Sequence, residues 1–143
     1  MAANGLMDTG AILAILRPHD RWHPACIKDL VTLRLPLLTS EAVLTELFHL
    51  VGTQAHNVDT AWAFVHSGAL TLGSISDADL PALSRLMHQY RDRPMDFADA
   101  TLVHLAQRES LSTILTVDVN DFQTYRITGQ KRFRILPGRV SLS

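Results

Sequence analysis

The sequence has few features of a secreted or membrane-bound protein. Cys26 is its single cysteine in 143 residues, so no internal disulfide can form and a reducing compartment is suitable. The first eight residues lack the basic start and long apolar stretch of a signal peptide. No apolar run approaches the roughly 18 residues that are needed to cross a bilayer. We therefore expect a cytoplasmic protein that has no membrane partner.

The composition also lacks the signs of a disordered chain. Hydrophobic residues make up 47% of the sequence and charged residues only 19%. This is enough apolar material to fill a core, and too much for an extended chain. The sequence shows no internal repeat, low-complexity tract or interdomain linker. We expect residues 1–143 to form a single domain, because this length fits one.

The charge is unevenly distributed, although the formal net charge is only −1. All 14 acidic residues lie within residues 1–121. The last 22 residues contain no acid, and their basic residues are Arg126, Lys131, Arg132, Arg134 and Arg139. Lysine and arginine supply the sequence-independent part of nucleic-acid affinity, and arginine binds phosphate in a bidentate manner. The basic segment is therefore either a phosphate-binding surface or an ordinary solvated strand and tail.

Short apolar strands alternate with helical segments along the chain. We expect strands at residues 5–7, 36–39, 70–75, 113–117 and 133–136, the last of them at an edge. Helices are expected at about residues 12–16, 20–33, 40–54, 57–67, 76–90 and 96–109. Ser40 is a predicted N-cap, and Ser76 with Asp79 resembles a capping box. Strands separated by helices indicate a parallel sheet that is covered on both faces, an α/β sandwich.

Two aspartates directly follow predicted strands. Asp8 comes after the first strand, and Asp118 comes after the strand at 113–117. In an open α/β sheet the carboxyl ends of the strands share one edge, where ligands bind. Both side chains are therefore expected to reach a common crevice. For either residue alone, a turn or a helix N-cap is the simpler interpretation.

Further acids lie on predicted helices or loops. Glu46 lies on or beside the core-facing stripe of its helix, and a buried carboxylate is costly unless it is paired or bound to a metal. The alternative is a glutamate that reaches solvent from the edge of the stripe. Asp96 and Asp99 share one face at a helix start; an N-cap explains Asp96 well and Asp99 less well. Asp121 is either an outer acid of the same site or a loop cap, and we favour the cap.

Carboxylates that converge from these places would repel one another. A divalent cation resolves that repulsion, and oxygen ligands are the kind that Mg²⁺ and Mn²⁺ prefer. The acidic residues therefore favour a carboxylate metal site. Zinc is disfavoured, because His19 and His23 form an isolated i, i+4 pair with no glutamate between them.

Four short motifs follow one another along the chain. They are Met7-Asp8-Thr9 before an apolar helix, Thr39-Ser40 leading to Glu46, Asp96-Phe97-Ala98-Asp99-Ala100, and Thr116-Val117-Asp118 with Asp121-Phe122. In series they resemble the PIN-domain family, and most nearly the VapC-like ribonuclease toxins of type II toxin–antitoxin systems. Each motif is short, but together they span nearly the whole chain in the family's order.

The resemblance implies a three-layer α/β/α sandwich with a parallel sheet of four or five strands. It also implies an endoribonuclease that depends on Mg²⁺ or Mn²⁺, together with a homodimer mate and a small antitoxin as partners. Its implied catalytic residues are Asp8, Glu46, Asp99 and Asp118. The accessory residues are Asp96, Thr9 and Thr116, and we add Asp121 to them.

From these assignments we expect a division of roles within the site. Asp8 and Asp99 are expected to bind the metal directly, and Asp118 directly or through water. Glu46 is expected to orient the attacking water or to act as general base. The residues expected to hold the RNA backbone are Arg126, Lys131, Arg132 and Arg134.

Other functional classes fit the sequence less well. A phosphoacceptor receiver domain needs a lysine late in its sheet, and the only lysines are Lys28 and Lys131, the latter in a predicted turn. An aspartate-nucleophile phosphatase needs a second aspartate two residues after the first, and Gly10 occupies that position. The stronger alternative is a non-catalytic PIN-like module that docks a basic partner segment in its acidic pocket. Metal binding and EDTA-sensitive RNA cleavage distinguish an enzyme from such a module.

Overall fold

The computed structural model describes residues 3–93 and 95–138, so Arg139 lies outside the described residues. Five strands form one parallel sheet in the order β3-β2-β1-β4-β7. These strands are β1 (Leu6–Met7), β2 (Leu37–Ser40), β3 (Leu70–Gly73), β4 (Thr113–Thr116) and β7 (Arg134–Pro137).

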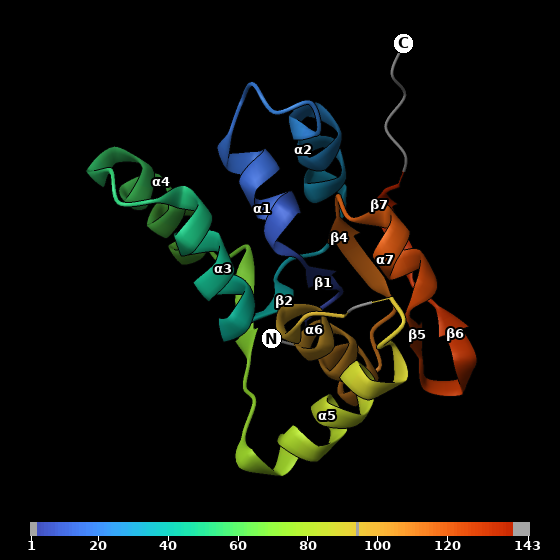
Figure 1. Ribbon diagram of the computed structural model, residues 1–143. Helices are drawn as coiled ribbons and strands as arrows, with labels where there is room; N and C mark the ends of the chain where they lie inside the picture. Colours follow the sequence, from blue (N-terminus) through green and yellow to red (C-terminus); the bar gives the residue numbers. More distant parts are fainter. Residues whose placement is uncertain (1–2, 94, 139–143) are drawn as a thin grey trace.

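Helices cover both faces of this sheet (Figure 1). In the first half of the chain they are α1 (Thr9–Leu16), α2 (His23–Thr32), α3 (Glu41–Val51) and α4 (Ala55–His66). In the second half they are the 3₁₀ turn η1 (Asp77–Asp79), α5 (Leu80–Gln89), α6 (Phe97–Arg108) and α7 (Val119–Thr124). Helices α1 and α2 lie on one side of the sheet and α5 and α6 on the other, while α3 contacts both α1 and α6. The expected three-layer α/β/α architecture is confirmed.

The central strand β1 has buried neighbours on both sides. Leu6 and Met7 are fully buried, and they pair in register with Ile114 and Leu115 of β4, which are fully buried too. Continuous apolar runs of this kind are typical of parallel strands that are covered on both faces. The core therefore fixes the register of β1 against β4. The register in turn determines where the carboxyl end of each strand lies relative to the other.

The structure contains two elements that the sequence did not predict. One is α7, and the other is an antiparallel hairpin of β5 (Arg126–Ile127) and β6 (Lys131–Arg132), joined by the turn η2 (Thr128–Gln130). Helix α7 has 6 residues and each hairpin strand has 2, so neither is long enough to show a hydrophobic period.

The predicted edge strand is present as β7, which pairs in parallel with β4. The longest helices, α4 and α6, each have 12 residues. Within residues 3–93 and 95–138, none of the helices combines the length and apolar character needed to cross a membrane.

Candidate active site

Asp8 lies at the carboxyl end of β1, where its backbone and side chain are both held. Its N–H donates to the carbonyl of Leu115 at 3.0 Å, which extends the pairing of β1 with β4 by one residue. Its carboxylate caps α1, because Oδ1 accepts from the N–H of Thr9 at 2.8 Å. Oδ2 accepts from the Thr116 hydroxyl at 3.0 Å. The side chain is therefore fixed from two strands, and the residue is only 6% exposed.

Thr116, the last residue of β4, links Asp8 to Asp118. While its hydroxyl donates to Asp8, the same oxygen accepts from the N–H of Asp118 at 3.0 Å. The first turn of α1 lies very close to this segment: a Cβ at Gly10 would be 2.5 Å from Cγ2 of Val117. The start of α1 can therefore lie this close to Val117, directly after β4, because residue 10 has no side chain.

A second pair of acids lies at the start of α6. Asp96 caps this helix, and its Oδ1 accepts from the N–H of Asp99 at 2.8 Å. Asp99 is 7% exposed, and its Oδ2 accepts a hydrogen bond from the Tyr125 hydroxyl at 2.8 Å. Asp99 is thus held by its own helix and by a side chain from the far end of α7.

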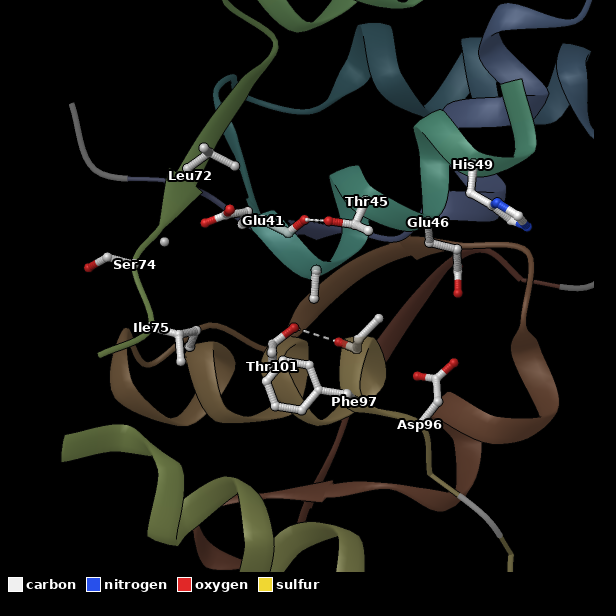
Figure 2. A pocket seen from close by; sticks show the side chains of 13 residues that line it. Glu41, Thr45, Glu46, His49, Leu72, Ser74, Ile75, Asp96, Phe97 and Thr101 are labelled. Carbon is white, nitrogen blue, oxygen red and sulfur yellow. Dashed lines mark hydrogen bonds between the residues drawn. The ribbon is translucent and has the colours of Figure 1, made fainter. Parts of the chain in front are cut away.

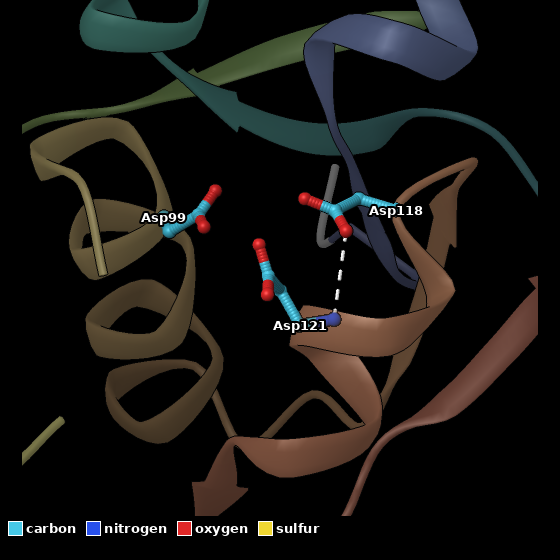
Figure 3. Close-up of side chains that lie close together, drawn as sticks. All are labelled: Asp99, Asp118 and Asp121. Carbon is cyan, nitrogen blue, oxygen red and sulfur yellow. Dashed lines mark hydrogen bonds between the residues drawn. The ribbon is translucent and has the colours of Figure 1, made fainter. Parts of the chain in front are cut away.

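Helix α7 repeats this arrangement of an aspartate cap and an aspartate three residues later. Asp118 is the N-cap, and its Oδ1 accepts from the N–H of Asp121 at 3.5 Å. One carboxylate oxygen from each of Asp99, Asp118 and Asp121 lies within 4.8 Å of the others, and Figure 3 shows these three side chains. Together with Asp8, whose charge acts on Asp99, they are called the acidic group below.

The predicted role of Asp121 as a loop cap is wrong. Asp118 is the cap, and Asp121 lies in the first turn of α7 with its carboxylate in the acidic group. The reason is that α7 places these two residues on one helix face, since positions i and i+3 are neighbours. Because that helix was not predicted, the orientation of Asp121 could not be predicted either.

Glu46 approaches from α3, on the other side of the acidic group. It is half-buried between the fully buried Val43 and Leu47 along its helix. Its carboxylate faces that of Asp96 across a groove of about 870 Å³ (Figure 2). Apolar surface in the groove comes from Leu72, Ile75 and Phe97. The groove therefore runs from the edge strand β3 to Glu46 and Asp96.

Burial and mutual repulsion raise the pKa values of three of these carboxyl groups. Burial, with the negative charges of Glu46 and Asp118, raises the pKa of Asp8 to about 6. The two hydrogen bonds that this carboxylate accepts lower the pKa, but they do not offset the burial. Burial, followed by the charges of Asp8 and Asp96, raises the pKa of Asp99 to about 8. Burial and the neighbouring Asp121 raise the pKa of Asp118 to about 6. The group therefore resists joint ionisation in the absence of a cation.

No protein cation relieves this repulsion within the described parts of the chain. The ion pairs found there involve Asp79 and Glu109, and none involves Asp8, Glu46, Asp96, Asp99, Asp118 or Asp121. In addition, the buried hydroxyl of Thr9, next to Asp8, has no hydrogen-bond partner in this part of the structure. A donor set made only of oxygen atoms and carrying excess negative charge fits Mg²⁺ or Mn²⁺.

The basic residues predicted to contact RNA lie on the β5–β6 hairpin and on β7. Lys131, Arg132 and Arg134 are exposed. Arg126 differs, because its Nη1 lies 2.8 Å from the carbonyl oxygens of both Gln123 and Thr124. Arg126 therefore closes the carboxyl end of α7, which gives it a structural contact that the sequence did not predict.

Tyr125 is the contact residue that the sequence analysis missed. It follows the Asp121-Phe122 motif, but its bond to Asp99 joins residues 26 positions apart. No local spacing or composition signals such a contact. Only the undetected helix α7 sets the direction in which this side chain points.

Comparison with known proteins agrees with this arrangement. Residues 6–127 match the PIN domain family. The chain belongs to the PIN-domain family. Within this family it is similar to Ribonuclease VapC26 of Mycobacterium tuberculosis, with 32% identity over 135 residues that cover 92% of this chain and 99% of that protein. The predicted VapC-like character of this PIN domain is thereby confirmed.

Two solved structures share the PIN-domain fold. Mycobacterium tuberculosis VapC20, described as a sarcin-ricin loop cleaving toxin, superposes with a TM-score of 0.69 and 16% identity over 78% of this chain and 87% of that chain. VapBC2 from Rickettsia felis, bound to a DNA fragment from its promoter, gives a TM-score of 0.65 and 14% identity over 92% of this chain and 97% of that chain. At these identities the likeness establishes the fold.

Proposed function

We propose that this PIN-domain protein is a divalent-metal-dependent endoribonuclease and the toxin of a toxin–antitoxin pair. The observation that carries the proposal is the convergence of carboxylates from the starts of α1, α6 and α7 and from the interior of α3, none of which forms an ion pair within residues 3–93 and 95–138. Support also comes from the relative named Ribonuclease VapC26 and from the neighbour described as a sarcin-ricin loop cleaving toxin. A docking module would present the same acids to a basic partner segment, so Mn²⁺ binding and EDTA-sensitive RNA cleavage are what distinguish the nuclease from it.

The metal ligands in this proposal come from two strand ends and one helix start. Asp8, Asp99 and Asp118 hold Mg²⁺ or Mn²⁺, and Asp121 is close enough to Asp99 and Asp118 to share in binding. A bound cation supplies Lewis acidity, which activates water and offsets the charge of the scissile phosphate.

The remaining residues position the reactants. Glu46, on the opposite side of the groove, orients the attacking water and accepts its proton. The N-termini of α1 and α6 direct the positive ends of their dipoles toward the acids, which reduces the repulsion among them. Lys131, Arg132 and Arg134 hold the RNA backbone through its phosphates.

The proposal is tested by removing charge from the site without changing its shape. Asp8→Asn and Asp99→Asn should each abolish Mn²⁺-dependent cleavage of a single-stranded RNA while the circular dichroism spectrum stays native. Asp59→Asn on the exposed side of α4 is the matched control, and it should cleave like the wild type. EDTA should stop cleavage and excess Mn²⁺ should restore it. Full activity in Asp99→Asn would refute the assignment.

The proposed partners are a homodimer mate and a small antitoxin, acting in the cytoplasm. An arginine of the antitoxin is proposed to enter the acidic group, because the guanidinium fork matches a carboxylate. Expression of the chain should arrest growth, and coexpression of a neighbouring small reading frame should relieve the arrest. Relief that persists after every arginine of that product is replaced would discard the arginine contact.

A further inference from the structure

The Tyr125 hydroxyl is the one side-chain donor to Asp99 within the described residues. Tyr125 is fully buried, and its hydroxyl donates to Oδ2 of Asp99 at 2.8 Å. It directly follows α7, four residues after Asp121, so Tyr125 and Asp121 share one face. Two side chains of this segment therefore lie beside Asp99. The Asp121 carboxylate lies within 4.8 Å of it, and the Tyr125 hydroxyl donates a hydrogen bond to it.

The ring of Tyr125 is held on two sides by other aromatic rings. The Phe122 ring lies edge-on at a centroid distance of 5.1 Å and an interplanar angle of 83°. The Tyr90 ring lies at 5.1 Å and 70°. The Tyr90 hydroxyl accepts from the N–H of Arg126 at 2.9 Å, a bond that involves none of the acids. The direction of the Tyr125 hydroxyl is therefore set by packing.

We infer that Tyr125 is a positioning residue for the metal site. It holds Asp99 through Oδ2, and Oδ1, which accepts no hydrogen bond from the described residues, faces the cation. The inference rests on the proposed function only in requiring that the acids bind a divalent cation. Residues that hydrogen-bond to a metal ligand fix its orientation, and replacing them typically costs about 10–100-fold in metal affinity or activity. The same bond also joins α6 to α7, and so sets the spacing of Asp99 from Asp118 and Asp121.

Tyr125→Phe separates this role from simple filling of the core, since it removes one oxygen and keeps the ring. The matched control is Tyr90→Phe, which removes a hydroxyl from the same aromatic group and touches no acid. By isothermal titration calorimetry, Tyr125→Phe should raise the Kd for Mn²⁺ about 10–100-fold, and Tyr90→Phe should change it less than twofold. In RNA cleavage, Tyr125→Phe should need more Mn²⁺ for half-maximal rate while the KM for RNA stays unchanged.

The outcomes separate this inference from the proposed function. If Tyr125→Phe binds Mn²⁺ as tightly as the wild type, the inference is overturned and the nuclease proposal stands. If the wild type binds Mn²⁺ but cleaves no RNA, the proposed function fails, and the comparison of Kd values still decides the role of Tyr125. If the wild type binds no Mn²⁺ at millimolar concentration, both are overturned.

A second measurement applies if Tyr125→Phe does not fold. The chain has two tyrosines, so fluorotyrosine-labelled wild-type protein gives two ¹⁹F resonances, which Tyr90→Phe assigns. Saturating Mg²⁺ should shift the Tyr125 resonance and leave that of Tyr90 in place. An unshifted Tyr125 resonance overturns the inference.

Discussion

The hydroxyl of Thr116 donates to the carboxylate of Asp8 at 3.0 Å and so joins the ends of two adjacent parallel strands across 108 positions of sequence. Because the same oxygen accepts from the N–H of Asp118, one fully buried hydroxyl sets the positions of two proposed metal ligands. The geometry of the acidic group is therefore sensitive to a residue that carries no charge.

Thr116→Val should weaken both the fold and the metal site. Valine keeps the shape but leaves the partly buried N–H of Asp118 without this acceptor, which costs about 1 kcal/mol, the low end of the range for a buried donor. We expect a lower melting temperature and a raised Kd for Mn²⁺, measured by calorimetry. Thr116→Ser, which retains the hydroxyl, is the control and should stay close to the wild type. Equal Kd values for the two variants would show that the hydroxyl has no positioning role.

Without metal, the protein should become less stable as pH rises from 5 to 8. Asp99 has a pKa of about 8 in the fold and an ordinary value of 3.8, so between these values the folded state holds a proton that the unfolded state has lost. Stability falls with pH wherever the folded state binds more protons. Asp8 and Asp118 add to this fall up to about pH 6.

Melting curves in EDTA test this pH dependence. The melting temperature should fall by several degrees between pH 5 and 8, and Asp99→Asn should flatten the profile because it removes the main titrating group. Added Mn²⁺ should stabilise more at pH 8 than at pH 5, since it binds the ionised carboxylates. A metal-free profile that rises over this range would contradict the assigned shifts.

Gly10→Ala should destabilise the protein, although alanine is the better helix former. In an ordinary helix interior this change is favourable by roughly 0.5–1 kcal/mol. Here the new Cβ would lie 2.5 Å from Cγ2 of Val117, so α1 or the end of β4 must shift. We expect a net loss of about 1–3 kcal/mol in urea denaturation, and the added change Val117→Ala should recover part of it. A stabilised Gly10→Ala variant would show that the close approach is absent.

The basic residues of the C-terminal segment should divide into two classes. Replacing Lys131, Arg132 and Arg134 with glutamine should raise the KM for RNA and reduce its salt dependence, because phosphate contacts release counterions. The melting temperature should stay unchanged, since all three side chains are exposed. Arg126→Gln should instead lower the melting temperature, because its guanidinium closes α7. If the triple replacement instead lowered the melting temperature and left the KM for RNA unchanged, while Arg126→Gln raised the KM, the hairpin would not belong to the proposed RNA surface.

Much of the fold was predictable because its signals are local. The strands at Leu6–Met7 and Thr113–Thr116 are apolar runs, and the carboxyl ends of parallel strands share an edge, so Asp8 and Asp118 were expected to meet. The caps at Ser40 and Asp96, and the capping box at Ser76, also formed as predicted. Each of these depends on residues within a few positions of one another.

The remainder of the candidate site depends on contacts between distant segments. Helix α7 is too short to show a period, so the direction of Asp121 could not be read, and its interpretation as a cap was wrong. The bond from Tyr125 to Asp99 and the closure of α7 by Arg126 arise only when that helix exists. The catalytic, metal-binding and RNA-binding roles stay predictions until the variants above are measured.

The raised pKa of Asp99 gives metal binding a measurable chemical by-product. At neutral pH most molecules carry a proton on this carboxyl group, and a cation that takes the oxygen must displace it. Loading the protein should therefore acidify an unbuffered solution. In a calorimeter, the apparent heat should vary with the ionisation enthalpy of the chosen buffer, so that Tris and phosphate report different values for the same association.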